Sequence, residues 1–252
     1  MNFANSLPEP AADWALFLDV DGTLAKIEFA PDEVRIAPRV ISLLGGLNTA
    51  LGGAVALVSG RTVDDLDRLF APLHMAAAGN HGVVRRGADG SITGPDADPA
   101  ALDHARTAFA RFAGEAPGVL VEDKTVSVAL HFRRAPERRD AAERLAAGLL
   151  TGLGPRYRLQ HGKMTVEIRP NGADKGTVVA AFMAEPPFRG RVPVFVGDDV
   201  TDEDGFDAVN RLGGHSVRVG AAPDTVARWQ CRDVDSLLDW LERLAASSPA
   251  EA

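Results

Sequence analysis

The stretch that decides the fold of this chain is residues 16–24, Leu16-Phe17-Leu18-Asp19-Val20-Asp21-Gly22-Thr23-Leu24. An apolar run over residues 14–18 predicts a buried strand, and Gly22 indicates that the strand ends in a loop. Open α/β sheets bind ligands beyond the carboxyl ends of their strands, so Asp19 and Asp21 are expected to share a pocket there. Two such carboxylates suit a divalent metal, with one free to attack and the other to transfer protons. A solvated turn is the alternative, because Asp and Gly are ordinary turn residues.

The composition is that of an ordinary globular protein, with 46% hydrophobic and 25% charged residues among 252. A net charge of −8 without a Lys/Arg cluster argues against a nucleic-acid partner. It leaves room for an anionic small-molecule substrate, because a metal and a few local cations can invert the field in one pocket. The single Cys231 excludes an intrachain disulfide and a multi-cysteine zinc site. With no signal peptide and no apolar run near the ~20 residues of a membrane span, we expect a cytoplasmic protein without a membrane partner.

Strands and helices are predicted to alternate in the two ends of the chain, which indicates an α/β fold with a parallel sheet. Strands are expected at 14–18, 54–58, 75–78, 192–196 and 216–219, and helices at 40–51, 62–70, 174–183, after 202 and at 234–245. The middle of the chain changes character. Helical segments at 99–113 and 136–150 and alternating segments at 119–132 and 157–168 predict a separate α+β module. The sequence thus predicts a core of residues 1–83 and 171–252, with residues 84–170 inserted into it.

Three further segments carry residues that phosphoryl transfer needs. Ser59 follows a predicted strand and offers a hydroxyl and loop amides to a phosphate oxygen, although a plain strand-to-helix turn would also explain it. Lys175 opens a predicted helix, where acids are usually preferred, and this favours a functional role. The run at 197–203, Gly-Asp-Asp-Val-Thr-Asp-Glu, repels itself unless a cation is bound.

In this order the segments resemble the four motifs of the haloacid dehalogenase superfamily, most of whose members are Mg-dependent phosphohydrolases. Further motifs fall in sequence: Ser-Gly-Arg at 59–61, Gly-Asn-His-Gly at 79–82, Leu-His-Phe-Arg at 130–133 and Gly-Lys-Met-Thr-Val-Glu-Ile-Arg-Pro at 162–170. As a set they resemble the trehalose-6-phosphate phosphatases over roughly residues 14–244. The chain departs from that family at Val20, often Tyr, and at Lys26, often Pro. The resemblance implies a Rossmann-like core and an inserted α+β cap that selects the substrate.

The resemblance also implies a role for each motif residue. Asp19 would be the nucleophile and Asp21 the general acid and base, while Ser59 and Lys175 would neutralise the phosphoryl oxygens. The residues implied at a Mg²⁺ site, directly or around it, are Asp19, Asp21, Asp198, Asp199 and Asp202. Those implied in substrate binding are Arg61, Asn80, His81, Glu122, Lys124 and Glu167. Charged residues on alternating strands are otherwise usually a solvated face.

The function implied is hydrolysis of trehalose 6-phosphate to trehalose and phosphate in trehalose biosynthesis, through an aspartyl-phosphate, by a monomer. Two alternatives stay open. One is a capped phosphatase of another sugar phosphate, such as sucrose or mannosylglycerate phosphate. The other is a non-catalytic domain that binds a sugar phosphate without hydrolysing it.

Overall fold

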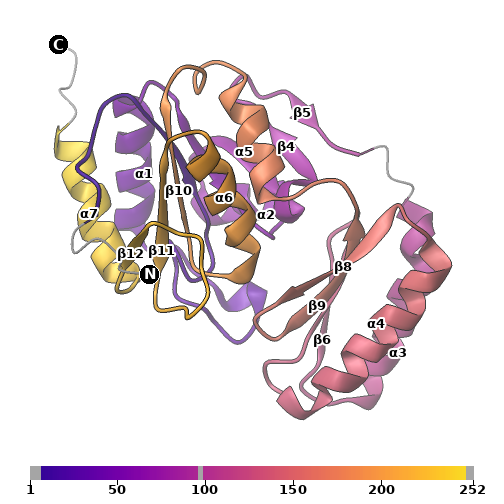
Figure 1. Cartoon of the computed structure of the whole chain (residues 1–252). Helices are drawn as coiled ribbons and strands as arrows, with labels where there is room; N and C mark the ends of the chain where they lie inside the picture. The colour runs from indigo at the N-terminus through magenta and orange to yellow at the C-terminus, as the bar shows by residue number, and fades with distance from the viewer. Residues whose placement is uncertain (1–6, 96–98, 248–252) are drawn as a thin grey trace. The chain divides into compact units, whose positions relative to one another are not determined.

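The computed structural model describes residues 7–95 and 99–247, which form two compact units (Figure 1). Of the described residues, the first unit comprises those up to Ile27, Val34–Thr93 and those from Asp174 onward. The second comprises Glu28–Glu33 and Gly94–Ala173. This division differs from the predicted core and cap at residues 28–33 and 171–173, which belong to the second unit, and at residues 84–93, which join the sheet of the first unit.

An eight-stranded sheet with the order β12-β11-β10-β1-β2-β3-β4-β5 forms the first unit. Its strands are β1 (Trp14–Leu18), β2 (Val55–Val58), β3 (Ala76–Gly79), β4 (Val84–Arg86), β5 (Ile92–Thr93), β10 (Val192–Gly197), β11 (His215–Val219) and β12 (Trp229–Cys231). Neighbours from β12 to β3 are parallel, and β4 and β5 add an antiparallel hairpin at one edge. All five residues of β1 are buried, as expected of a strand covered on both faces. The predicted parallel α/β sheet is therefore confirmed.

Helices cover both faces of this sheet. They are α1 (Pro38–Ala50), α2 (Val63–Phe70), α5 (Lys175–Met183), α6 (Glu203–Arg211) and α7 (Val234–Ser247). Figure 1 shows α1 and α7 on one side of the strands and α5 and α6 on the other. Phe17 of β1 stacks on Phe188 with ring centroids 5.4 Å apart and packs against Phe182 of α5 at 5.9 Å. This packing fixes the helix that begins at Lys175 against the strand that ends before Asp19.

An antiparallel four-stranded sheet with the order β6-β7-β9-β8 forms the second unit, and helices cover one of its faces (Figure 1). Its elements are α3 (Asp103–Glu115), β6 (Leu120–Asp123), β7 (Val128–His131), α4 (Arg139–Leu153), β8 (Tyr157–Gly162) and β9 (Thr165–Pro170). Alternate strand residues, among them Leu130, Val166 and Ile168, join Phe109 of α3 in a separate hydrophobic core. The two alternating segments of the sequence are thus two hairpins, the first turning at Thr125 (φ 67°) and the second at Met164 (φ 77°).

Strand β12 is absent from the sequence prediction. It is three residues long and carries the polar Gln230 at its centre, so it has no apolar run to reveal it. Among the helices of the described ranges, none combines the length and apolar character that crossing a bilayer requires.

Candidate active site

Asp19 and Asp198 lie beyond the carboxyl ends of two adjacent parallel strands, β1 and β10. The backbone amide of Asp19 donates a hydrogen bond to the carbonyl of Val196, 2.9 Å away. Gly22, with φ +85°, passes directly over Asp198, and a Cβ atom there would lie 2.3 Å from Asp198 Oδ2. The loop after β1 can therefore approach Asp198 only because residue 22 has no side chain.

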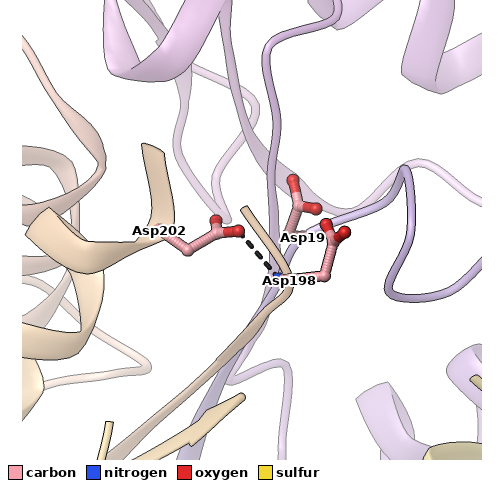
Figure 2. A group of neighbouring side chains, drawn as sticks. All are labelled: Asp19, Asp198 and Asp202. Carbon is pink, nitrogen blue, oxygen red and sulfur yellow. Dashed lines mark hydrogen bonds between the residues drawn. The ribbon is translucent and has the colours of Figure 1, made fainter. Parts of the chain in front are cut away.

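A buried cluster of three carboxylates occupies this edge of the sheet. Asp19, Asp198 and Asp202 each offer an oxygen, and these oxygens all lie within 4.8 Å of one another (Figure 2). The Lys175 ammonium contacts two of them, with Nζ 2.8 Å from Asp19 Oδ1 and 2.6 Å from Asp202 Oδ1. The Thr23 hydroxyl donates a hydrogen bond to the other oxygen of Asp19 at 3.3 Å.

The buried cluster thus contains three carboxylates and one ammonium group, which contacts two of them. Burial raises the pKa of Asp19 well above its usual value, against the pull of Lys175. Burial would lower the pKa of Lys175, but Asp19 and Asp202 raise it, so this side chain stays charged. The surplus negative charge and the all-oxygen donor set fit a hard divalent cation such as Mg²⁺.

Asp202 closes the loop that follows β10. Its Oδ2 accepts a hydrogen bond from the backbone amide of Asp198 at 2.9 Å (Figure 2) and another from the amide of Asp199 at 2.8 Å. Gly197 admits this fold-back, because a Cβ on it would lie 2.2 Å from Asp202 Cγ. Asp199 is half-buried, and its carboxylate is not part of the three-residue cluster. Asp202 thus accepts two backbone amide hydrogen bonds on Oδ2 and the Lys175 ammonium on Oδ1, so its carboxylate holds the loop and the lysine in place.

Lys175 is held in place by the start of helix α5. Asp174 caps the helix, accepting from the Thr177 amide at 2.7 Å, while the Thr177 hydroxyl accepts from the Asp174 amide at 2.9 Å. Gly176 allows α5 to touch α6, since a Cβ there would lie 2.4 Å from the carbonyl oxygen of Asp204. The predicted helix is therefore confirmed, with Asp174 as its N-cap and Lys175 as its first residue.

Ser59, Arg61, Asn80 and His81 form two interlocked turns after β2 and β3. The Asn80 amide donates to the Arg61 carbonyl at 2.8 Å, and the His81 amide donates to the Ser59 carbonyl at 2.9 Å. Asn80 and His81 both have left-handed backbone angles, with φ of 53° and 56°. Consecutive non-glycine residues in this region cost free energy and are concentrated at functional sites.

Asp21 lies outside the carboxylate cluster. Its carboxylate accepts two hydrogen bonds from Arg61, Nε to Oδ2 and Nη2 to Oδ1, each 2.7 Å long. The sequence places Asp21 among the metal-site residues, and the structure leaves its backbone near the cluster while its side chain pairs with Arg61.

Glu122, Lys124 and Glu167 come together in the second unit. Lys124 Nζ lies 3.0 Å from Glu167 Oε2 and 3.5 Å from Glu122 Oε2, and His131 Nε2 lies 2.8 Å from Glu122 Oε2. Burial would lower the pKa of Lys124, but the two glutamates raise it. Burial would raise the pKa of Glu122, but Lys124 and His131 lower it. Glu122 and Lys124 are therefore charged members of a partly desolvated group of hydrogen-bonding residues.

The sequence prediction missed three residues that shape these groups: Thr23, His131 as a partner of Glu122, and Arg218. Arg218 Nη2 donates to the carbonyl of Asp198 at 2.6 Å, and its Nη1 donates to Glu203 Oε1 at 2.8 Å. The available signal was an arginine flanked by Val217 and Val219 in a predicted core strand, and all three of these residues are buried in β11.

A family model described as trehalose-phosphatase matches residues 17–234 of this chain. A Sinorhizobium fredii protein described as a probable trehalose-phosphate phosphatase is 45% identical over 219 residues, which cover 87% of this chain and 82% of that one. The Escherichia coli trehalose-6-phosphate phosphatase is 43% identical over 244 residues, covering 95% and 90%. Among solved structures, the C-terminal domain of the C. albicans trehalose-6-phosphate phosphatase shares the fold, with a TM-score of 0.81, 21% identity and coverage of 93% and 92%. A haloalkanoate dehalogenase-superfamily phosphatase from Bacteroides thetaiotaomicron also shares it, with a TM-score of 0.61, 19% identity and coverage of 94% and 96%.

Proposed function

Because the chain belongs to the trehalose-phosphatase family, we propose that it is a Mg²⁺-dependent hydrolase that converts trehalose 6-phosphate to trehalose and phosphate through an aspartyl-phosphate on Asp19. The observation that carries the chemistry is the Asp19–Lys175–Asp202 contact beside Asp198. It offers a nucleophile, a fixed cation for phosphoryl oxygens and an oxygen-rich place for a metal.

The carboxylates of Asp19 and Asp198, with the backbone carbonyl of Asp21, would hold the Mg²⁺ ion. Asp202 and Asp199 would support that set, Asp202 through the loop it closes. A bound Mg²⁺ ion neutralises charge on the transferred phosphoryl group. A cation there would also offset the charge of carboxylates gathered in a buried place beside a single lysine.

Two displacements at phosphorus make up the reaction. In the first, an oxygen of Asp19 attacks phosphorus, the bond from phosphorus to the sugar 6-oxygen breaks, and Asp21 gives its proton to that oxygen. In the second, water attacks the phosphorus of the aspartyl-phosphate and gives a proton to Asp21, while the bond from phosphorus to Asp19 breaks. Lys175 and Ser59 stabilise the charge on the equatorial oxygens throughout.

We assign sugar recognition to the second unit, which acts as the cap. Glu122, Lys124 and Glu167 offer charged acceptors and a donor to sugar hydroxyls, and hydrogen bonds to charged groups are the stronger ones. Asn80 and His81, in the turn beside Ser59, contribute to the substrate pocket in this proposal.

The test is phosphate release from trehalose 6-phosphate, measured with Mg²⁺ and after chelation, alongside sucrose 6-phosphate and mannosylglycerate phosphate. We expect Mg²⁺-dependent release that is fastest with trehalose 6-phosphate. Asp19→Asn is expected to lower turnover by on the order of a thousandfold or more, as removal of a nucleophile does elsewhere, with an unchanged circular-dichroism spectrum. A faster reaction with another sugar phosphate would replace the substrate assignment. Residual activity of Asp19→Asn within tenfold of wild type would show that another group attacks.

A further inference from the structure

The contact between Arg61 and Asp21 has the geometry of a clamp. Two guanidinium nitrogens, Nε and Nη2, donate to the two different oxygens of one carboxylate, each over 2.7 Å. The Arg61 side chain is 9% exposed, whereas that of Asp21 is 36% exposed. A fork of this kind fixes both the position and the plane of the carboxylate, which a single-point ammonium does not.

The base of the Arg61 side chain is itself fixed from two sides. Its amide donates to Ser59 Oγ at 3.2 Å, and its carbonyl accepts from the Asn80 amide at 2.8 Å. Gly79 leaves room for this turn, because a Cβ on it would lie 2.7 Å from the Arg61 carbonyl oxygen. The left-handed turn at Asn80 and His81 thus determines where the guanidinium can reach.

The carboxylate cluster is paired with a different cationic side chain, that of Lys175. Lys175 contacts Asp19 and Asp202, while Asp21 accepts hydrogen bonds from Arg61 on both of its side-chain oxygens. The two acids of the opening motif therefore have separate cationic partners. Lys175 accompanies the residue that attacks, and Arg61 accompanies the residue that transfers protons.

We propose that Arg61 is the positioning residue of the proton-transfer step, holding the Asp21 carboxylate in the plane from which it serves the sugar oxygen and then the water. This inference rests on the proposed function and replaces the sugar-binding role that the sequence resemblance implies for Arg61. The proton moves from Asp21 to the departing sugar oxygen, and later from water to Asp21. Arg61 keeps all of its protons, since a guanidinium is not deprotonated in proteins. Without the clamp, Asp21 rotates and is aligned for only part of the time.

The test compares a leaving group that needs a proton with one that does not. Trehalose leaves as a sugar hydroxyl, whereas p-nitrophenolate departs without protonation. Single-turnover release of trehalose from trehalose 6-phosphate and of p-nitrophenol from p-nitrophenyl phosphate is measured for wild type, Arg61→Lys and Arg61→Gln. Asp21→Asn serves as the benchmark for complete loss of the acid. General acid catalysis contributes about 10²–10⁴-fold, so we expect trehalose release to fall at least about tenfold more than p-nitrophenol release in both Arg61 variants. The KM for trehalose 6-phosphate should change little.

Two outcomes would overturn the inference. Equal losses on both substrates would place Arg61 on the phosphoryl group or in the fold, and the thermal unfolding midpoint separates those two. A raised KM for trehalose 6-phosphate at unchanged single-turnover rate would return Arg61 to sugar binding. Failure of the proposed function is visible separately, as a wild-type enzyme that does not release trehalose. In that case the comparison is made on whichever alkyl phosphate the wild type hydrolyses.

Discussion

At the scale of single residues, the candidate active site requires glycine at two positions as well as its charged side chains. Gly22 and Gly197 both lie where a Cβ atom would collide with a carboxylate, that of Asp198 in the first case and Asp202 in the second. Two loops from different strands can therefore bring Asp19 and Asp198 together only because these positions carry hydrogen. Close approach of backbone to a ligand-binding group is a recurrent use of glycine.

We predict that Gly22→Ala strongly reduces phosphatase activity and Mg²⁺ affinity. The new methyl group would lie 2.3 Å from Asp198 Oδ2, so the carboxylate must move. Displacement of a reacting group by about 1 Å can cost about 10²-fold in rate. The measurements are phosphate release and calorimetric titration with Mg²⁺, which reports on the site without turnover.

Gly90→Ala is the matched control for this substitution. Gly90 has φ +84° against +85° at Gly22, but no atom of the described residues beyond its chain neighbours lies within 4 Å of a Cβ placed on it. Both variants therefore carry similar backbone strain, of about 1–2 kcal/mol, and only Gly22→Ala disturbs Asp198. Equal effects of the two substitutions on Mg²⁺ binding would show that strain, and not the collision, is responsible.

The residues that could be predicted from the sequence are those next to strand ends and helix starts. Asp19, Ser59, Lys175 and Asp198 all hold such positions, and a parallel sheet gathers strand ends at one edge. Arg218 could not be found in this way. It stands opposite Gly197 in the register of β10 and β11, and that register becomes visible only in the structure.

At the scale of elements, the hairpin β4–β5 shows how a salt bridge attaches a segment to the core. Arg86 of β4 donates to both oxygens of Asp67 in α2, at 2.6 and 2.7 Å, and also to the carbonyl of Met75. Residues 84–93 look in sequence like the start of the inserted module, because they are turn-rich and follow the last parallel strand. They pair instead with β3, the strand just before them, and β4 reads Val-Arg-Arg, so it has no apolar run to mark it as part of the core sheet.

We predict that Asp67→Asn destabilises the protein by about 1–2 kcal/mol at pH 7, since it weakens hydrogen bonds to a charged, mostly buried partner. The hydrogen bonds from Arg86 lower the pKa of Asp67 below its usual value of 3.8. A depressed folded-state pKa contributes stability above the unfolded pKa and loses it as the pH falls through the folded value. The difference between wild type and variant should therefore narrow below about pH 4.

Urea unfolding at pH 7 and at pH 3 measures this difference. Asp64→Asn is the control, because Asp64 is an exposed carboxylate on the same helix. It should change the free energy of unfolding by only a few tenths of a kcal/mol. A gap between wild type and Asp67→Asn that stays constant over this pH range would argue against an ionic contribution from Asp67.

At the scale of the whole molecule, the chain separates chemistry from the proposed recognition of the sugar. Asp19, Lys175 and Asp198 belong to the first unit, and Glu122, Lys124 and Glu167 to the second. The two-module organisation is legible in the sequence because helix–strand alternation gives way to segments that alternate with a period of two. The exact limits of the modules cannot be read from the sequence. Residues 28–33 join the second unit, where Arg134 contacts Glu33 and lies over the Phe29 ring at 5.8 Å.

Because the two proposed roles belong to different units, we predict that Glu167→Ala slows hydrolysis of trehalose 6-phosphate but not that of p-nitrophenyl phosphate. Glu167 is buried and lies 3.0 Å from Lys124 in the second unit, which is the unit proposed to bind the sugar, whereas Asp19 and Lys175 belong to the first. Hydrogen bonds to charged groups are worth about 1.5–3 kcal/mol, which corresponds to roughly a 10–150-fold loss in kcat/KM for trehalose 6-phosphate. A contact that does not react contributes only when its partner is present, so p-nitrophenyl phosphate should lose little. Glu137→Ala, an exposed glutamate of the same unit, controls for the loss of a negative charge there. Equal losses on both substrates would place Glu167 in the chemistry or in the stability of its unit, and a thermal melt of the variant tells these two apart.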